Sequence, residues 1–184
     1  MKKTNPIAEQ SKRWLVKALI ELMQEKPYSS ISVKEIADKA QLSRRTFYRN
    51  FNIKEDLLTE YANYLFKEYM DALKELTNLN ISDLFIVYFK FWNNHLKELK
   101  LFKKNHLFYS LMEQINLFIS HFNTIPNVKW HDYDNQAEEE YISFYNIGGL
   151  WNVLSNWIDH EDRESPEEMS KILTKAISNF SKGL

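Results

Sequence analysis

Arginine is scarce in this chain and is concentrated in one short stretch. The sequence holds five arginines against nineteen lysines, and Arg44, Arg45 and Arg49 fall within six residues. A guanidinium group is a planar fork that pairs with a phosphate or a guanine edge through two hydrogen bonds, which a lysine ammonium cannot do. The clustering therefore indicates a contact with phosphates or with nucleic-acid bases.

The residues around these arginines have the spacing of a short amphipathic helix. Ser43 is a residue type that caps helices, and Phe47 and Phe51, four residues apart, predict the buried face. The outer face then carries groups able to read base edges and thymine methyls in a major groove: Arg44, Arg45, Thr46, Tyr48 and Arg49. The alternative interpretation is an arginine-rich face that is only solvated.

A second short helix is expected immediately before this one. Ser32 and Glu35 form the capping-box pattern S-x-x-E, which predicts a helix that starts at Val33. A turn of three or four residues near Gln41 and Leu42 would join the two helices. Two helices of this length joined by such a turn have helix-turn-helix spacing.

The N-terminal stretch that carries these motifs, residues 6–58, resembles the N-terminal signature of TetR-family transcriptional regulators. The patterns Ile-Ala at 36–37, Ser-x-x-Thr-Phe-Tyr at 43–48 and Phe-x-x-Lys-Glu-x-Leu at 51–57 all occur in register. The family usually has a glycine where this chain has Gln41, so a residue with a side chain must fit the dihedral angles of that turn.

The resemblance implies a homodimer that binds a pseudo-palindromic double-stranded DNA operator and usually represses transcription. It also implies a small-molecule effector site in the C-terminal domain, which releases the operator when it is filled. A lysine that begins the fourth helix would add to the amides and dipole that attract phosphate there. The DNA-contacting positions of the family carry over to Ser32, Val33, Arg44, Arg45, Thr46, Tyr48, Arg49 and Lys54.

Charge and composition agree with a helical protein that meets a polyanion at one end. Residues 1–55 carry a net charge of +6 and the remainder −7, although the whole chain has a charge of −1. Three glycines and four prolines in 184 residues favour long helices over sheets. The sequence has no membrane-span-length apolar run and no signal-peptide pattern, so we expect a cytoplasmic protein without membrane contact.

The expected fold is all-α, with a three-helix DNA-binding domain at 1–53 and a helical effector-binding and dimerisation domain at 54–184. The first helix is expected at 6–26, and a fourth helix at 53–76 would bridge the two domains. Ser82 and Asp134 are expected to cap later helices, with a break near 103–105 and a loop at 123–133. Ser165, Pro166 and Glu168 predict the start of the last helix.

Aromatic residues make up 15% of the chain, and many lie between residues 85 and 122. They predict either a well-filled helical core or a pocket lined with rings for a mainly apolar small molecule. The series continues through Phe118, Ile119 and Phe122. The residues expected to line the pocket are Phe85, Tyr88, Phe89, Trp92, Phe108, Met112 and Ile115.

The last two helices have the apolar surface that a dimer interface needs. The helix expected at 134–159 is apolar on all sides, so one side can face its own core and the other a second subunit. The pair Gly148 and Gly149 costs about 1 kcal/mol per residue in a helix, offset either by close helix approach or by a kink beside a ligand. The predicted interface comprises Tyr141, Tyr145, Gly148, Trp151, Ile172, Ile177 and Phe180.

Several classes of protein are excluded or disfavoured. The chain has no cysteine, no phosphate-binding glycine loop, no G-x-S-x-G motif and no histidine pair at metal-ligand spacing. We therefore expect no enzyme, no catalytic residues, no metal and no cofactor. The alternative function is a TetR-fold interaction protein or coactivator that acts through another protein, and the arginine face argues against it.

Overall fold

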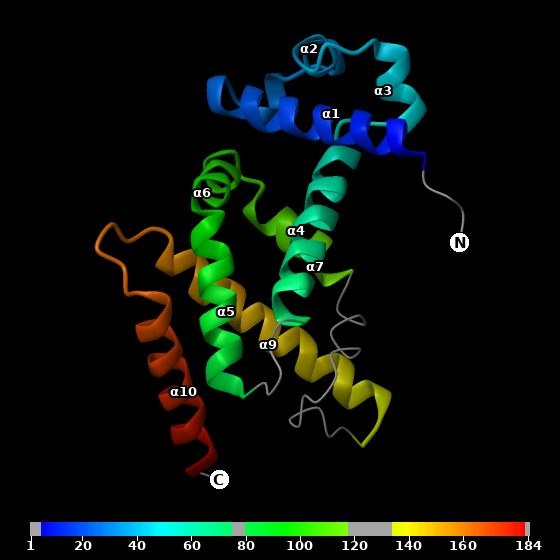
Figure 1. Ribbon diagram of the computed structural model, residues 1–184. Coiled ribbons are helices and arrows are strands. Elements are labelled where there is room, and N and C mark those ends of the chain that lie inside the picture. Colours follow the sequence, from blue (N-terminus) through cyan, green and yellow to red (C-terminus); the bar gives the residue numbers. More distant parts are fainter. Residues whose placement is uncertain (1–4, 75–79, 118–133, 183–184) are drawn as a thin grey trace. The chain divides into compact units, whose positions relative to one another are not determined.

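The computed structural model describes residues 5–74, 80–117 and 134–182, and every regular element in these ranges is a helix (Figure 1). The expected all-α fold is confirmed. The expected loop at 123–133 lies outside the described residues, as do Phe118, Ile119 and Phe122 and the side chain of Phe180. The elements are α1 (Pro6–Glu25), the 3-10 turn η1 (Tyr28–Ser30), α2 (Val33–Lys39), α3 (Arg44–Asn50), α4 (Asp56–Lys74), α5 (Ile81–Asn94), α6 (Leu96–Lys104), α7 (Phe108–Asn116), α9 (Gln136–Trp157) and α10 (Pro166–Lys182).

The chain forms two compact units. The first comprises residues 1–65 and 101–114, and the second comprises residues 66–100 and 115–184. The helix-turn-helix residues therefore share a unit with the start of α4, the end of α6 and most of α7. Part of this packing joins segments far apart in sequence: the rings of Tyr61 and Phe102 stack with centroids 5.2 Å apart.

Two capping boxes begin the helices that the sequence predicted most specifically. At α2, the Glu35 N–H donates to Ser32 Oγ at 3.3 Å, and the Ser32 N–H donates back to the Glu35 carboxylate at 2.9 Å. At α10, the Glu168 N–H donates to Ser165 Oγ at 3.2 Å, and the Ser165 N–H donates to Glu168 at 2.8 Å. Both starts are confirmed, because this reciprocal pattern depends on residues only three positions apart.

Two other predicted caps are wrong by one or two residues. The Asn80 side chain caps α5 by accepting the Asp83 N–H at 2.9 Å, whereas the sequence pattern favoured Ser82. The Asn135 side chain caps α9 by accepting the Glu138 N–H at 3.0 Å, one residue after Asp134. Several good capping residues stand within one turn at both places, so local preference does not choose between them.

The turn after α2 keeps the geometry that glycine would give it. Gln41 has a φ of 57°, in the left-handed region that favours glycine. Its N–H donates to the Asp38 carbonyl at 3.0 Å, and the Leu42 N–H donates to the Ala37 carbonyl at 2.9 Å. These two bonds form a Schellman motif, which ends α2 and reverses the chain toward α3.

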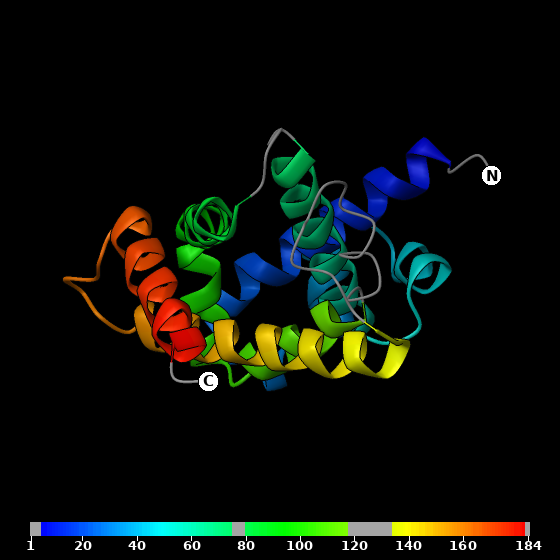
Figure 2. The ribbon, with the colours of Figure 1, turned by 90° about the horizontal axis from the view of Figure 1, so that it is seen from below.

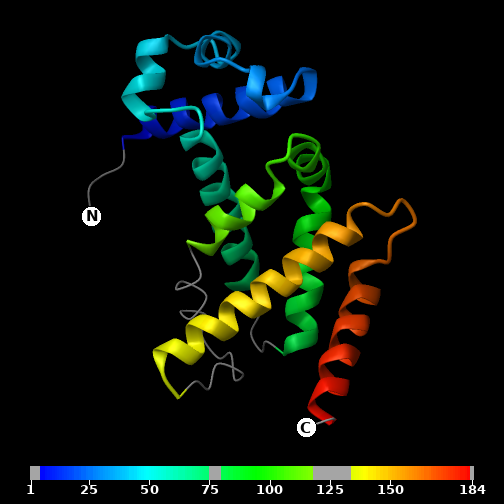
Figure 3. The same ribbon diagram turned by 180° about the vertical axis from the view of Figure 1, so that it is seen from behind.

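The second unit has an aromatic core between α5 and α9. Figure 3 shows α9 crossing α5, and Figure 2 shows α10 on the neighbouring side of α5. Phe89 packs edge-on against Trp157 and Trp92 against Trp151, both with ring centroids 5.3 Å apart. The Ser170 hydroxyl on α10 donates to the Ser82 carbonyl at 2.7 Å. Most of the rings in this part of the chain are therefore core residues.

Candidate nucleic-acid interface

Helix α3 is held in the first unit by its two phenylalanines. Phe47 is fully buried and Phe51 is nearly so, and their rings lie 5.8 Å apart. Ser43 begins the helix by accepting the Thr46 N–H at 3.0 Å. Because both apolar side chains point into the core, the opposite face of α3 is left to solvent, as the four-residue spacing predicted.

The arginines of this outer face are exposed, and none of them pairs with an acidic side chain that the structure describes. Arg44, Arg45 and Arg49 are all exposed, and no carboxylate among the described residues lies within ion-pair distance of them. Other cations of the same unit are neutralised: Lys39 pairs with Glu25 at 2.9 Å. Positive charge that no described carboxylate compensates is therefore displayed along α3, where a polyanion can reach it.

Two further α3 residues have orientations set by their neighbours. Tyr48 is 50% exposed, and its ring packs edge-on against Phe47 at 5.3 Å, which leaves the phenol directed away from the core. The Thr46 hydroxyl lies 3.0 Å from the Ser43 hydroxyl and is only partly exposed. Tyr48 is thus free to meet a base or phosphate, whereas Thr46 shares its hydroxyl with the cap of α3.

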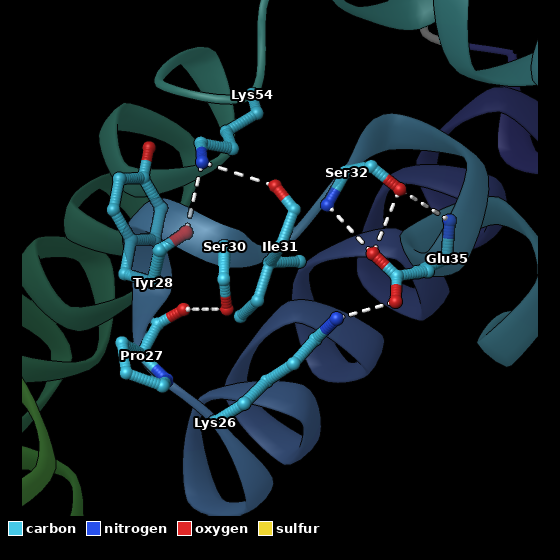
Figure 4. Close-up of polar contacts among 8 residues, drawn as sticks. All are labelled: Lys26, Pro27, Tyr28, Ser30, Ile31, Ser32, Glu35 and Lys54. Atoms are coloured by element: carbon cyan, nitrogen blue, oxygen red, sulfur yellow. Dashed lines mark hydrogen bonds and ion pairs between the residues drawn. The ribbon is translucent and has the colours of Figure 1, made fainter.

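The start of α2 is tied into a polar network with α1 (Figure 4). The Ser32 hydroxyl donates to the Glu35 carboxylate at 2.8 Å, and Lys26 forms an ion pair with the same carboxylate. The hydrogen bond from Lys26 and those from Ser32 lower the pKa of Glu35 from 4.5 to about 2. Val33, the first residue of α2, is half-buried, and the only hydroxyl proton of Ser32 is already bound within the protein.

Lys54 has internal partners that its sequence position does not reveal. Its ammonium donates to the carbonyls of Tyr28 and Ile31 at 2.8 and 3.0 Å (Figure 4) and lies 4.2 Å from the centroid of the Tyr28 ring. The helix expected from residue 53 begins at Asp56, so Lys54 lies in the turn before α4. The resemblance assigns Lys54 to phosphate, and the sequence carries no signal for these contacts, because they join residues more than twenty positions apart.

The residues expected to line an effector pocket belong to both compact units. The first unit holds Phe108, which is buried, and Met112, which is half-buried. In the second unit, the Tyr88 hydroxyl is buried and has no hydrogen-bond partner of normal geometry among the described residues. The other members in the second unit are Phe85, Phe89, Trp92 and Ile115.

The predicted dimer residues separate into surface and core. Tyr145 on α9 is 77% exposed, and a Cβ added at Gly148 would meet nothing within 4 Å. Trp151 was expected at the interface, but it is only 2% exposed because its ring packs against Trp92 inside the second unit. The remaining predicted residues whose side chains the structure describes, Tyr141, Ile172 and Ile177, are exposed.

Residues 5–74, 80–117 and 134–182 contain neither a metal-binding cluster nor a membrane-spanning helix. Among those residues, no group of three or more histidine, cysteine, aspartate or glutamate side chains is placed to hold a metal ion. None of the helices in these ranges is both long enough and apolar enough to cross a lipid bilayer.

Comparison with known proteins gives a consistent set of relatives. The family model described as "Bacterial regulatory proteins, tetR family" matches residues 15–61, which include all of α2 and α3. The chain is 30% identical over 148 residues to the HTH-type dhaKLM operon transcriptional activator DhaS of Lactococcus lactis subsp. lactis (strain IL1403). That match covers 74% of this chain and 73% of the relative.

Two solved structures share the fold. The dihydroxyacetone kinase operon activator DhaS is 20% identical with a TM-score of 0.52, covering 94% of this chain and 96% of that chain. The fatty acid degradation regulator FadR from Bacillus halodurans is 17% identical with a TM-score of 0.60, and the match covers 95% of each chain. At these identities the structural matches show the helical fold alone.

Proposed function

Because this chain belongs to the TetR family of bacterial DNA-binding transcription regulators, we propose that it controls transcription in the cytoplasm as a homodimer on a pseudo-palindromic operator. A mainly apolar small molecule would bind the second unit and release the DNA. The observation that carries the proposal is the outer face of α3, where Arg44, Arg45 and Arg49 are exposed without acidic partners among the described residues.

The roles on α3 follow from the chemistry of each side chain. A guanidinium can fork a guanine through its O6 and N7 atoms or clamp a phosphate, and a phenol can donate to either. Arg44, Arg45, Tyr48 and Arg49 would supply these contacts in the major groove. Ser32, Val33 and Thr46 would lie beside the sugar-phosphate backbone of the DNA. There the amides at the start of α2 can approach a phosphate.

The exposed faces of α9 and α10 support a homodimer. Tyr141 and Tyr145 are one helical turn apart and both largely exposed, and open space lies over Gly148 one turn further on. Large rings beside a glycine allow two α9 helices to approach closely, with Ile172 and Ile177 of α10 at the flank. A two-fold axis through this face would present two α3 helices to the two halves of a pseudo-palindrome.

The Tyr88 hydroxyl supports an effector with a polar group. Burial raises the pKa of Tyr88 well above 10, so the phenol stays neutral and can donate a hydrogen bond. The Tyr88 ring packs edge-on against two others, with centroid distances of 6.4 Å to Tyr69 and 5.2 Å to Phe89. The effector would therefore be mainly apolar and carry at least one hydrogen-bond acceptor for Tyr88.

Activation of transcription is a second candidate, favoured by one comparison. The Lactococcus lactis relative is described as a transcriptional activator of the dhaKLM operon. The same α3 contacts would serve a repressor and an activator, because the difference lies in where the operator stands relative to the promoter. A reporter gene behind the protein's own upstream region, with and without the protein, decides the direction.

The test of the whole proposal is selection of a DNA duplex from a random-sequence library by the purified protein. We expect enrichment of a pseudo-palindrome, bound at two protein chains per duplex and weakened steeply between about 50 and 200 mM salt. Failure to enrich any sequence, with no shift of the DNA flanking its own gene, would favour an interaction protein that has kept only the fold.

A further inference from the structure

The segment between α1 and α2 is held by a network that converges on one residue, Tyr28. Its carbonyl accepts the Lys54 ammonium at 2.8 Å, and its phenol donates to the Glu55 carboxylate at 3.1 Å. Its N–H donates to the side-chain oxygen of Asn105, the residue that follows the end of α6, at 2.7 Å. Both polar groups of the Tyr28 backbone are therefore bonded to side chains from elsewhere in the first unit.

The Lys54 ammonium is the centre of this network. It bridges the carbonyls of Tyr28 and Ile31, the first residue of η1 and the residue that follows it (Figure 4). Its charge also lies 4.2 Å from the centroid of the Tyr28 ring, within the range of a cation–π interaction. Two of the three ammonium N–H groups are thus bonded to carbonyls within the protein, and the Tyr28 ring also lies against the ammonium.

This bridge holds the residue that precedes the N-cap of α2. Ile31 is 2% exposed and is followed directly by Ser32, the N-cap of α2. Without the ammonium, the Ile31 carbonyl would lose its side-chain donor. The turn would then be held by fewer bonds: those from the Ser30 N–H to Pro27, from the Ile31 N–H to Tyr28, and from the Tyr28 N–H to Asn105. Because α2 packs on α3, movement of this turn changes the angle at which α3 meets the groove.

We propose that Lys54 is a positioning residue, which locks the turn before α2 to the start of α4 and so orients α3 on DNA, and that it makes no phosphate contact. Asn105 acts on the same turn from the end of α6. The inference rests on the proposed recognition of DNA through α3, and it reassigns a lysine that the family resemblance placed on the phosphate backbone.

The salt dependence of DNA binding separates the two roles of Lys54. The probe is the duplex selected from the random library by the wild-type protein, and its dissociation constant is measured by fluorescence anisotropy across about 50–200 mM NaCl. Lys54→Met keeps the aliphatic stem and removes the ammonium. We expect the dissociation constant to rise about tenfold or more at every salt concentration, with an unchanged slope of log Kd against log [NaCl].

A phosphate contact by Lys54 gives a different result, which would overturn the proposal. Loss of one neutralised phosphate from each of the two bound chains lowers the slope by about 1.8, so the variant would approach the wild type at high salt. An unchanged dissociation constant would overturn it as well. Arg49→Met is the matched control on α3, and it is expected to show this loss of slope.

Asn105→Ala tests the network without changing any charge and remains informative if Lys54→Met fails to fold. We expect weaker binding with an unchanged slope, and a double variant whose loss is smaller than the product of the two single losses, because both act through Tyr28. Circular dichroism below the melting temperature checks that each variant is folded. If the affinity loss of the double variant equals the product of the two single losses, the shared network is overturned. Normal DNA binding by Arg49→Met would instead overturn the proposed recognition through α3.

Discussion

Replacing Gln41 with glycine is expected to stabilise the protein, because this residue holds a left-handed conformation at a φ of 57°. A residue with a β-carbon loses roughly 1–2 kcal/mol in that region relative to a right-handed conformation. Glycine removes this strain. Its greater conformational freedom in the unfolded chain, however, lowers the free energy of unfolding by roughly 0.5–1 kcal/mol. The net expectation is a gain of about 0.5–1 kcal/mol in the free energy of unfolding.

The gain is measurable as a shift in the thermal unfolding midpoint. For a chain of this length, 1 kcal/mol corresponds to about 2–4 °C, so Gln41→Gly should melt about 1–4 °C above the wild type. Circular dichroism at one protein concentration records the shift. DNA affinity should stay unchanged, because both hydrogen bonds of the turn come from backbone groups that glycine retains.

Gln41→Ala is the matched control for this substitution. Alanine removes the side chain beyond the β-carbon but keeps the left-handed strain, so its melting temperature should stay near that of the wild type. A glycine variant no more stable than the alanine variant would refute the strain argument. It would also mean that the turn between α2 and α3 adopts another backbone conformation in solution.

Three further predictions concern DNA binding, assembly and pH. Alanine at Arg44, Arg45 and Arg49 together should weaken binding to the selected duplex and lower its salt slope by about 0.9 for each neutralised phosphate; wild-type affinity in anisotropy titrations would contradict this. Tyr145→Glu should yield a folded monomer in sedimentation velocity, since the ring is 77% exposed in the single chain; a persistent dimer would exclude this face. Glu35, whose pKa is lowered from 4.5 to about 2, contributes stability that is fully present above pH 4.5 and lost as the pH falls toward 2. Glu35→Gln should therefore flatten the fall in melting temperature over that range, and an equal fall in both proteins would speak against this role.

The starts of α2 and α10 and the two faces of α3 follow from the sequence with little help from tertiary structure. The boxes Ser32–Glu35 and Ser165–Glu168 locate the starts of α2 and α10 because they act across three residues. The spacing of Phe47 and Phe51 leaves the arginines outside for the same reason, since neighbours one turn apart share a helix face. The helix-turn-helix and its charged face can therefore be predicted from the sequence alone.

What covers each apolar surface was decided only by tertiary packing. Helix α9 is apolar on all sides, and periodicity alone does not distinguish Trp151, which faces the core, from Tyr145, which faces solvent. The same limit applied to the ring-rich segment, which proved to supply core residues to both units. A helical period reports which residues share a face, but the partner of that face comes from elsewhere in the chain.

The role of Lys54 depends most strongly on the folded structure. Lys54 is a cation that precedes a helix, and a cation in that position is suited to bind a phosphate. The sequence indicates no other role for it. Folding brings the carbonyls of Tyr28 and Ile31 within 3.0 Å of its ammonium, and these acceptors are more than twenty residues away. The acceptors of the Lys54 ammonium are backbone carbonyls, which every residue carries. No pattern of side chains therefore predicts these contacts.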